Sequence, residues 1–560
     1  MIRGELAQTI QAALEHAVRE GALPECDTPP ISIERPKNPE HGDYSSNIGM
    51  LLARGLHKPP IEVAQTIASH ISHPGVSLAK VAAPGFINLR LDPDWIAGHL
   101  PRVLAMDERF GETDIGRGKR ALVEYVSANP NGPLTLGHGR NGVIGDVLAR
   151  CLRKAGWEVE TEFYLNDSAA SLQMQLFGES VRARYLQLLG YDVSLPDDGY
   201  KGEYLVELAK AIREKYGDSL AEGDHAQDKL LFKRLAEQEM RDDQAKDIEA
   251  FRLHFDHFVS EQKLHDDGLV EAAVAQLREH GYAYDREGAV WFRSTDFGDD
   301  KDRPLVRSTG EPTYIAADAA YHKNKYDRGY DLMIDVWGAD HHGYVPRMKA
   351  VVAAMGYDPD KLQLLIYQLV RLWRGKDQVR MSTRAGEMIT LREVLDEVGV
   401  DVARFFFLMR SHDTALDFDL ELAKKRSDEN PVYYVQYAHA RICSILRKAE
   451  LEDLQAGECT PGLLTDPAEV VLELKLLELP DEVERVVVET APHRLTTYSQ
   501  DLARLFHLFY DRCRVVDPAN PERSRARLTL CQAVRVTLRN SLELMGVSAP
   551  ERMEKETDER

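Results

Sequence analysis

The chain has 560 residues and is acidic, because 92 Asp and Glu outnumber 70 Lys and Arg and leave a formal net charge of −22. A hydrophobic fraction of 43% over this length is enough for several domains with buried cores, and it excludes a disordered or collagen-like chain. No stretch approaches the roughly 20 apolar residues that cross a bilayer, and acidic residues interrupt the N-terminal helical pattern where a secretory signal would be apolar. We therefore expect a cytoplasmic protein that binds no membrane.

The six cysteines are scattered without a close pair, so the sequence predicts neither a zinc site built on cysteines nor a disulfide framework. We expect them to be small core residues. The acidic balance argues against binding of nucleic acid over the whole surface, but it allows a local basic face on one domain.

Three blocks can be recognised along the chain. Residues 1–110 begin with an amphipathic helix and close with a strand-like segment, which predicts an N-terminal α+β domain. Residues 111–400 open with a strand over 121–126, a helix over 139–155 and a strand over 157–165. This alternation predicts a parallel, Rossmann-like sheet.

Charged helical periodicity over about 170–280 predicts a helical insertion between two halves of that sheet. Strand-like patterns return at 289–293 and 332–336. Residues 401–560 have a helical period nearly throughout, with breaks at prolines, and predict an all-α bundle. The predicted fold class is therefore a multidomain α/β protein, in which an N-terminal α+β domain and a C-terminal helical bundle flank the sheet domain.

The loop after the strand over 121–126 carries the first candidate site. It runs over residues 127–142 into a helix N-terminus preceded by small residues, with His138 at its mouth. Backbone N–H groups at such a terminus can hold a nucleotide's phosphates, while the imidazole donates to charge that develops at phosphorus. Taken alone, His138 could equally be a capping or core histidine.

The same loop contains the letters of a dinucleotide fingerprint, with glycines at 137, 139 and 142 and an acidic residue about 20 positions later. In that fingerprint the strand runs almost directly into the first glycine, because a tight turn brings the pyrophosphate onto the helix N-terminus. Here residues 127–136, with two prolines, intervene, which disfavours a nicotinamide-dependent oxidoreductase. No P-loop pattern is present.

Two later stretches add polar groups. Residues 337–343 (WGADHHG) follow the strand over 332–336, so their side chains would lie at a strand's carboxyl end, where open α/β sheets bind ligands. His341 and His342 beside Asp340 could bind a metal, but adjacent side chains diverge and no further cluster completes the set, so we expect none. Residues 380–386 form a basic loop of the kind that closes over polyphosphate, or else a solvated turn.

Together these motifs resemble those of the class I aminoacyl-tRNA synthetases. The segment 135–138 (TLGH) stands where that family carries its HIGH signature, and 380–384 (RMSTR) stands where it carries KMSKS, about 240 residues downstream. The segments 127–133, 295–303, 337–342 and 430–441 look like those of bacterial arginyl-tRNA synthetases. Thr135 and Thr383 depart from the two signatures.

The resemblance covers nearly the whole chain. Residues 38–44 and 83–88 look like that family's N-terminal additional domain, which contacts the tRNA corner, and residues 492–495 and 546–553 look like its helical anticodon-binding domain. It implies a ligase that activates L-arginine with ATP and Mg²⁺, transfers it to tRNA(Arg), needs no zinc and acts as a monomer.

The resemblance also implies site residues. Catalysis falls on His138, Arg380 and Arg384. ATP contacts fall on Pro130, Thr135, Gly137, His138, Gly338, Asp340, His341, Met381 and Ser382. Arginine contacts fall on Glu124, Asn129, Tyr314 and Asp318. Contacts to tRNA fall on Asn38, Tyr44, Asn88, Tyr437, Arg441 and Arg514.

The residue types predicted to contact arginine suit it, because a guanidinium needs carboxylates in a shielded pocket. Tyr314 and Asp318 would share one face of a helix. Asp318 could instead pair with His322. The main alternative function is a catalytically impaired paralogue that only binds tRNA, which rests on Thr135 and Thr383 alone. A synthetase for another amino acid would make the carboxylates a coincidence.

Overall fold

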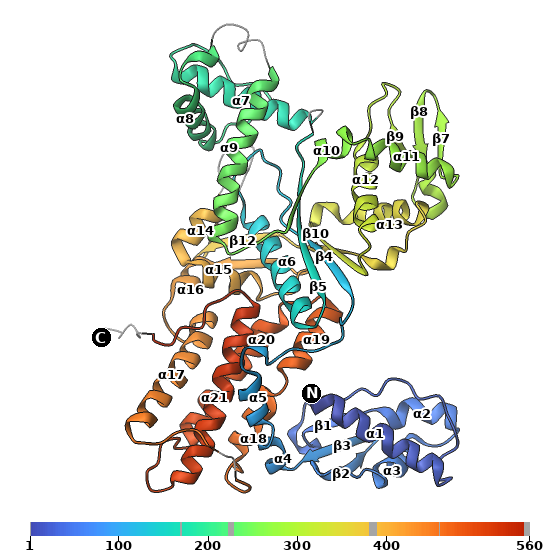
Figure 1. Cartoon of the computed structure of the whole chain (residues 1–560), viewed down its shortest axis with the longest axis vertical. Helices are drawn as coiled ribbons and strands as arrows, with labels where there is room; N and C mark the ends of the chain where they lie inside the picture. The colour runs from blue at the N-terminus through green and yellow to red at the C-terminus, as the bar shows by residue number, and fades with distance from the viewer. Residues whose placement is uncertain (1, 169–170, 222–228, 380–388, 458–459, 554–560) are drawn as a thin grey trace.

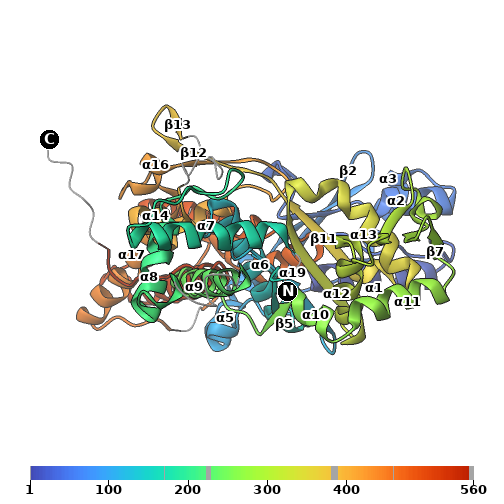
Figure 2. The same ribbon diagram turned by 90° about the horizontal axis from the view of Figure 1, so that it is seen from above.

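The computed structural model describes residues 2–168, 171–221, 229–379, 389–457 and 460–553. The predicted loop residues Arg380, Met381, Ser382, Thr383 and Arg384 lie outside this part of the chain. Figure 1 shows an elongated molecule with a central sheet, a helical bundle and an N-terminal domain at one end, and two lobes at the other. Seen from above, α7–α9 and α11–α13 lie on opposite sides of α6 (Figure 2).

The N-terminal domain is a small antiparallel sheet covered by helices. Its strand order is β1-β3-β2, and Tyr44 of β1 lies opposite Leu89 of β3. The apolar positions of α1 recur at helical spacing and are buried, which explains why this amphipathic segment folds onto the sheet. The elements are α1 (Ile2–Arg19), β1 (Tyr44–Ser46), α2 (Ile48–Leu56), α3 (Pro60–Ser69), β2 (Val76–Ala82) and β3 (Phe86–Leu91).

Two short helices connect this domain to the rest of the molecule. They are α4 (Pro93–Ala97) and α5 (Leu100–Met106), and they contact α18 and α21 of the C-terminal bundle. The end of the block predicted over 1–110 therefore also lies against the bundle.

The central sheet has five strands in the order β11-β10-β4-β5-β6, all parallel. The strand of this sheet that comes first in the chain, β4, therefore lies in the middle. The later strands are added on both sides of it. The predicted βαβ unit is present. Its elements and the remaining strands are β4 (Arg120–Glu124), α6 (Leu136–Lys154), β5 (Glu158–Leu165), β6 (His257–Ser260), β10 (Leu332–Gly338) and β11 (Leu362–Tyr367).

The helical insertion is shorter than the predicted range of about 170–280. Its three helices share a separate hydrophobic core, and they project from the sheet in Figure 1. The chain then returns to the sheet as β6, a four-residue strand hidden in the charged periodicity, so the prediction was wrong beyond α9. The helices are α7 (Leu172–Leu188), α8 (Tyr204–Tyr216) and α9 (Lys229–Ala250).

A second lobe follows β6, with its own core around α11, α12 and α13. The strand signal near 289–293 belongs to an antiparallel sheet of this lobe, in the order β7-β8-β9, and not to the central sheet. The elements are α10 (Glu261–Asp266), α11 (Leu269–Glu279), β7 (Ala283–Arg286), β8 (Ala289–Phe292), β9 (Arg303–Val306), α12 (Tyr314–Asp327) and α13 (Val345–Ala354).

A three-stranded sheet, β13-β12-β14, joins the sheet domain to the C-terminal block. Its member β14 lies inside residues 401–560, so the prediction of an all-helical block was wrong for this segment. β14 pairs in parallel with β12, with Val370 opposite Leu416. The elements are β12 (Val370–Arg374), β13 (Asp377–Val379), α14 (Leu391–Val398), α15 (Val400–Phe407) and β14 (Leu416–Asp419).

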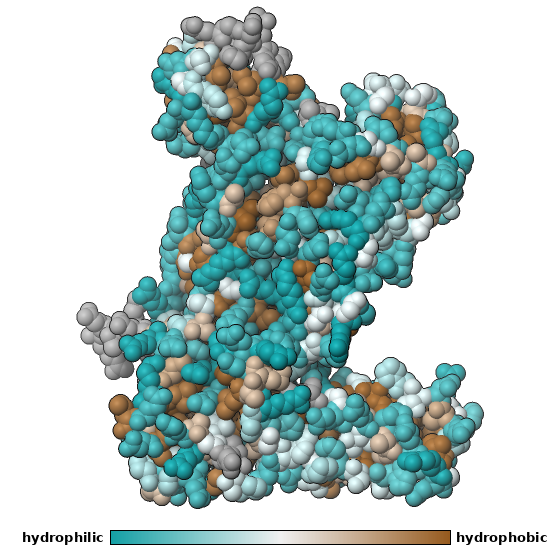
Figure 3. Space-filling model, viewed as in Figure 1, coloured by the Kyte–Doolittle hydropathy of each residue, from teal (hydrophilic) through white to brown (hydrophobic). Residues whose placement is uncertain are grey.

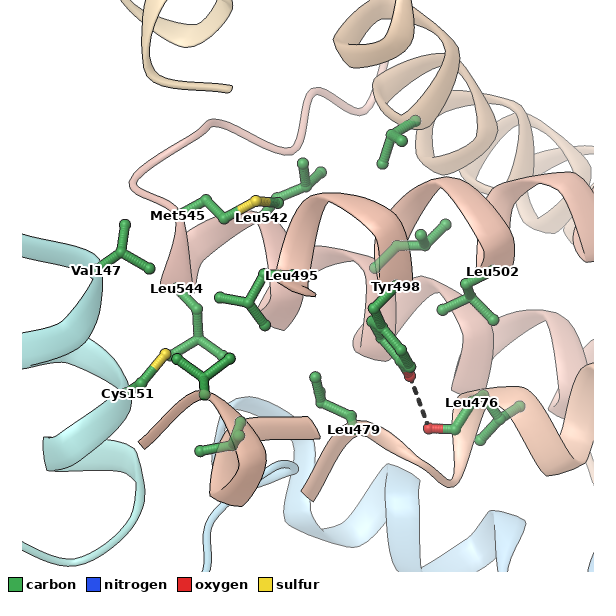
Figure 4. Packing of buried hydrophobic residues seen from close by; sticks show 14 of the residues in the cluster. Val147, Cys151, Leu476, Leu479, Leu495, Tyr498, Leu502, Leu542, Leu544 and Met545 are labelled. Carbon is green, nitrogen blue, oxygen red and sulfur yellow. Dashed lines mark hydrogen bonds between the residues drawn. The ribbon is translucent and has the colours of Figure 1, made fainter. Parts of the chain in front are cut away.

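The rest of the block is a helical bundle whose core is continuous with that of α6. Figure 4 shows Val147 and Cys151 of α6 near Met545, while the Tyr498 hydroxyl donates to the Leu476 carbonyl at 3.1 Å. The helices are α16 (Leu420–Lys424), α17 (Pro431–Leu451), α18 (Pro467–Leu476), α19 (Leu479–Glu489), α20 (Arg494–Arg512) and α21 (Pro521–Leu544).

Arg404 of α15 is the main polar contact across this junction. Its guanidinium, fully buried, donates to the carbonyl oxygens of Met545 and Phe251 at 2.9 Å each and pairs with Asp146 of α6. A Cβ at Gly546 would lie 2.3 Å from this guanidinium, and Gly546 has a φ of +67°, so both space and backbone conformation require glycine there.

Among helices in the described part of the chain, none combines the length and apolar character needed to span a bilayer. The face shown in Figure 3 is largely hydrophilic, with apolar residues gathered between the helical insertion and the central sheet. Four of the cysteines are buried as predicted, namely Cys151, Cys443, Cys513 and Cys531.

Candidate active site

The candidate site lies where the carboxyl ends of β4 and β10 diverge. The order of the sheet reverses direction at this point, and such switch points are where open α/β sheets bind ligands. Asn141 of α6 holds the two strand ends together. Its amide oxygen accepts from the N–H of Val126 at 2.6 Å, and its amide nitrogen donates to the carbonyl of Val336 at 2.7 Å.

The N-terminus of α6 is closed by a capping box made of two of the predicted site residues. The hydroxyl of Thr135 accepts from the N–H of His138 at 3.4 Å, and the N–H of Thr135 donates to His138 Nδ1 at 3.1 Å. Thr135 therefore occupies the first signature position as a helix cap.

The capping box also fixes the state of the imidazole. Burial lowers the pKa of His138 to about 4, so the ring is neutral near pH 7. Because Nδ1 accepts from a backbone N–H, the ring proton is on Nε2. His138 is thus an uncharged hydrogen-bond donor beside the helix N-terminus.

Two glycines of the apparent dinucleotide fingerprint, Gly139 and Gly142, allow apolar side chains to pack closely against α6. A Cβ at Gly139 would lie 2.7 Å from the Leu391 side chain, and one at Gly142 would lie 2.6 Å from Leu253. These positions face apolar side chains and not open space for a pyrophosphate. The structure therefore removes the support for the oxidoreductase alternative.

Gly137 and Gly338, both predicted to contact ATP, lie on two sides of the same hydroxyl. A Cβ at Gly137 would be 3.5 Å from the Tyr367 hydroxyl, and one at Gly338 would be 3.7 Å from it. The start of α6, the end of β10 and the end of β11 thus converge. Tyr367 was missed by the sequence analysis, since nothing local distinguishes it from a strand tyrosine.

The loop after β4 is strained and clamped. Val126 and Ser127 have φ of +65° and +41°, which is unusual for residues with a Cβ. The buried Gln244 of α9 donates to the carbonyls of Asn129 and Gly132 at 3.1 and 2.7 Å. The helical insertion therefore holds the backbone beside Asn129 and Pro130, a contact between segments far apart in the sequence.

Two carboxyls that repel each other, Asp318 of α12 and Glu261 of α10, form an acidic cluster beside the switch point. Asp318 of α12 accepts from the Tyr344 hydroxyl at 2.6 Å, and burial raises the pKa of its carboxyl. Burial, together with the charges of Asp318 and Asp167, raises the pKa of Glu261 to about 7. His265 Nε2 lies 3.8 Å from a Glu261 oxygen, but burial still disfavours ionisation of both carboxyls, so the cluster suits a positively charged ligand.

Glu261 was missed because it follows the short strand β6, which the periodicity had hidden. The alternative in which the Asp318 carboxylate pairs with the His322 ring is not observed. His322 Nδ1 lies 2.8 Å from the backbone oxygen of Asp318, and its Nε2 lies 3.0 Å from Asp335. Tyr314 is the first residue of α12, one turn before Asp318, and its side chain is 67% exposed.

Further along α12, the polar side chains of Tyr321 and Lys325 face the central sheet. The ammonium of the fully buried Lys325 donates to Glu124 at 2.5 Å and to Asp335 at 2.7 Å, and the Tyr321 hydroxyl donates to Glu124 at 3.0 Å and to Glu162 at 2.8 Å. Burial raises the pKa of Glu124, whereas Lys325 and His322 hold the pKa of Asp335 below its usual value despite burial.

Glu124 is therefore 5% exposed and has its partners within the protein. The contact of Glu124 with arginine stays a prediction, and Lys325 and Tyr321 hold one Glu124 oxygen in the core. Its other oxygen accepts from the Ser127 hydroxyl at 2.8 Å. The sequence carries a pattern that predicts this polar face, because Asp318, Tyr321 and Lys325 recur at helical spacing in an alanine-rich segment.

Asp340 and His341 lie in the turn after β10 and are largely exposed, with side-chain exposures of 82% and 55% and an ion-pair distance of 3.5 Å. They form no group of three metal-ligating side chains with any other residue in the described ranges. The polar turn is thus open to a ligand at the rim of the site.

The backbone next to the basic loop reaches the signature on α6. β13 ends at Val379, before the loop, and Thr390 after it forms an antiparallel bridge with Thr135. Thr390 caps α14 through a second capping box with Glu393. The segment that follows the basic loop therefore lies beside the start of α6, and the loop residues themselves lie outside the described part of the chain.

The predicted tRNA contacts fall into two groups. The side chains of Tyr44 and Asn88 are 1% and 8% exposed, inside the N-terminal sheet, which argues against direct contact by either. Asn38 is exposed in a turn, where its side chain accepts from the N–H of Glu40 at 3.0 Å. The second group, Tyr437, Arg441 and Arg514, lies on the bundle.

Tyr437 and Arg441 of α17 are partly exposed. The Arg441 guanidinium lies 4.3 Å from the ring centre of Tyr510 and 5.9 Å from that of Tyr437. Arg514 is 72% exposed and 3.7 Å from Asp517. These side chains are placed where a loop base could stack or pair.

Comparison with known proteins covers the whole chain. The model of the arginyl-tRNA synthetase N-terminal domain matches residues 4–91, that of the class I (R) tRNA synthetase catalytic domain matches residues 99–413, and that of the DALR anticodon-binding domain matches residues 435–553. The fold is shared with the Thermus thermophilus arginyl-tRNA synthetase, with a TM-score of 0.75, 24% identity, and coverage of 99% of this chain and 100% of that one.

Relatives of nearly equal length give the same result. The arginine–tRNA ligase of Moorella thermoacetica is 47% identical over 553 residues, which cover 98% of each chain. That of Heliobacterium modesticaldum is 47% identical over 564 residues, which cover 99% of each chain. With its three domains in the order that the models describe, the chain belongs to the arginyl-tRNA synthetase family of class I aminoacyl-tRNA synthetases.

Proposed function

We propose that this chain activates L-arginine with ATP and transfers it to the 3′-terminal adenosine of tRNA(Arg). The observation that carries the proposal is the acidic cluster of Asp318 and Glu261 beside a capped helix N-terminus that holds a neutral imidazole. The cluster suits a guanidinium, and the helix end suits a triphosphate. The two lie at one switch point of the sheet.

For arginine, Asp318 and Glu261 would bind the guanidinium, with Tyr344 orienting Asp318 through its hydroxyl. Tyr314 would cover the cluster from the start of α12. The Glu124 oxygen that accepts from Ser127 would also accept from the α-ammonium, beside Asn129. Lys325 acts as a positioning residue that holds Glu124.

For ATP, the N–H groups at the start of α6 and the Nε2 proton of His138 would stabilise the departing pyrophosphate. Gly137 and Gly338 would let the nucleotide approach the backbone, and Pro130, Thr135, Asp340 and His341 line the same rim. Arg380, Met381, Ser382 and Arg384 complete the phosphate contacts in this proposal. Mg²⁺ would accompany ATP on its phosphate oxygens and neutralise part of their charge.

The reaction then has two steps. The arginine carboxylate attacks the α-phosphorus in line and expels pyrophosphate, and the terminal hydroxyl of the tRNA attacks the resulting mixed anhydride and expels AMP. Positioning and charge stabilisation account for the catalysis, and no protein nucleophile is required. The tRNA would contact Asn38 on the N-terminal domain and Tyr437, Arg441 and Arg514 on the bundle.

We further propose three functional units, over residues 1–110, 111–400 and 401–560. We also propose that the chain acts as a monomer, as the family resemblance implies. The substrates tRNA and ATP support a cytoplasmic location.

Arginine-dependent exchange of pyrophosphate into ATP tests the proposal. The assay is run with and without tRNA(Arg), with lysine in place of arginine as the control. Exchange with arginine and not with lysine supports the proposed function, whether or not tRNA(Arg) must be present. Bound tRNA without any exchange would support the impaired paralogue.

A further inference from the structure

A cluster of metal-ligating side chains lies in the N-terminal domain, away from the proposed active site. His16 and Glu20 are one helical turn apart at the end of α1, and His70 ends α3. His16 Nε2 is 3.2 Å from one Glu20 oxygen, and His70 Nε2 is 3.0 Å from the other. The three ligand atoms lie within 4.8 Å of one another, and within the described ranges no other group of three is so arranged.

The hydrogen bonds of His70 determine where its proton is. Nδ1 lies 2.7 Å from the carbonyl oxygen of Thr66, which can only accept, so Nδ1 carries a proton. In the neutral ring, Nε2 then has a lone pair and faces a carboxylate oxygen, which is also an acceptor. Two acceptors at this distance need a cation between them, and that cation is either a second proton on the ring or a metal ion.

The spacing fits a metal. In a tetrahedral Zn²⁺ site with bonds of about 2.0–2.1 Å, ligand atoms are about 3.3 Å apart, and each histidine Nε2 lies near this distance from one of the two Glu20 oxygens. The Thr66 carbonyl fixes the tautomer and orientation of His70, as the outer partners of metal-bound histidines do. The edge-to-face rings of His16 and His70, with centres 5.1 Å apart, leave both Nε2 atoms directed at Glu20.

We propose that His16, Glu20 and His70 bind one Zn²⁺ ion, with water as the remaining ligand. Two imidazoles and one carboxylate favour Zn²⁺ and similar transition metals over Mg²⁺ or Ca²⁺, which prefer oxygen ligands. The ion links the end of α1 to the end of α3. Cysteine spacing could not reveal such a site, because its ligands are histidines and a carboxylate that lie up to 54 residues apart.

The test uses the full chain after removal of metals with a chelator. Co²⁺ and, separately, Zn²⁺ are titrated into the wild type and into His16→Ala and His70→Ala. His57→Asn serves as the matched control, because His57 is an exposed histidine of the same domain, in a left-handed conformation that asparagine tolerates. Far-UV circular dichroism confirms that each variant is folded.

The expected result is one Co²⁺ per chain with the visible absorption of a tetrahedral site, displaced by Zn²⁺, and a higher Tm with Zn²⁺. Each alanine variant should bind at least about tenfold more weakly and lose the rise in Tm, while His57→Asn should match the wild type. Absence of binding to the wild type would leave the protonated ion pair in place of the metal. Equal binding by all variants would place the metal elsewhere. Either outcome overturns the proposal.

Discussion

The backbone N–H of Leu391 donates to the carbonyl oxygen of Leu134 at 2.7 Å. This bond joins the first residue of α14 to the residue just before the cap of α6. The segment that follows the basic loop is thereby fixed to the segment that presents His138, although about 250 residues separate them in the chain. The start of α14 is therefore held at the start of α6 by main-chain contact as well as by side chains.

Replacing Leu391 by proline removes this bond while keeping a residue that suits the first helical position. The preceding residue, Thr390, has φ −79° and ψ 160°, which proline allows. Leu391→Ala is the control, because it also loses the buried side chain but keeps the N–H. We expect the proline variant to be less stable than the alanine variant by about 1 kcal/mol in urea unfolding, and to exchange pyrophosphate more slowly. Equal behaviour of the two would show that the bond is unimportant.

Replacing His138 by alanine should slow arginine activation by about 10²-fold, because the neutral Nε2 donor is lost from the transition state. Single-turnover adenylate formation measures this rate. Since the pKa of His138 is lowered to about 4, its protonation should not contribute to the pH dependence between about pH 6 and 9. A His138-dependent step near pH 6.5 would contradict the neutral donor.

Glu261→Gln should raise the KM for arginine more than it lowers kcat, because one carboxylate facing the guanidinium is removed. In the wild type, the KM should rise as the pH falls below about 7, where Glu261 takes up a proton. The variant should lose this dependence. Glu271→Gln, at an exposed position of the following helix, is the control.

The same carboxyl predicts a stability effect of opposite sign. The pKa of Glu261 in the folded protein lies above its ordinary value of 4.5, so ionisation disfavours the folded state as the pH rises from 4.5 to about 7. Glu261→Gln should therefore be more stable than the wild type at pH 8 and lose that advantage near pH 4. Urea unfolding at the two pH values measures it, and a variant less stable at pH 8 would count against the raised pKa.

Lys325→Met should destabilise the fold by about 3–5 kcal/mol, because Glu124 and Asp335 are left as buried carboxyls without their cation. Their pKa values should then rise, so the loss should grow with pH. Adding Glu124→Gln to Lys325→Met should recover part of the stability but not arginine binding. Lys323→Met, two residues away and paired with Asp327 nearer the surface, should cost much less.

The parts of this molecule that the sequence predicted have strong local signals. The unit β4–α6–β5 combines apolar strands with a long helix, and the motif at Thr135 and His138 follows directly from it. β6 and β14 are four residues long and lie in charged, helix-like surroundings, so periodicity could not separate them.

The candidate site was predictable to the extent that its motifs are contiguous. The ammonium of Lys325 reaches Glu124 across 201 residues of sequence, and no local pattern announces such a pair. Glu261 depends on β6 for its position. Tyr44 belongs to the motif at residues 38–44 that predicted tRNA contacts, but its side chain is buried in the core. Burial and long-range pairing are properties of the folded chain.

Arg404 and the pairing of β12 with β14 bear on how members of this family could be recombined. A chimaera that joined the first 400 residues of this chain to another bundle would keep Asp146 and Phe251 but receive a foreign partner for each. It would also exchange one strand of the small sheet that leads into the basic loop. A graft that respects these contacts would carry Arg404, residues 416–419 and Gly546 as a set, so the inherited unit is a network and not a linear stretch of sequence.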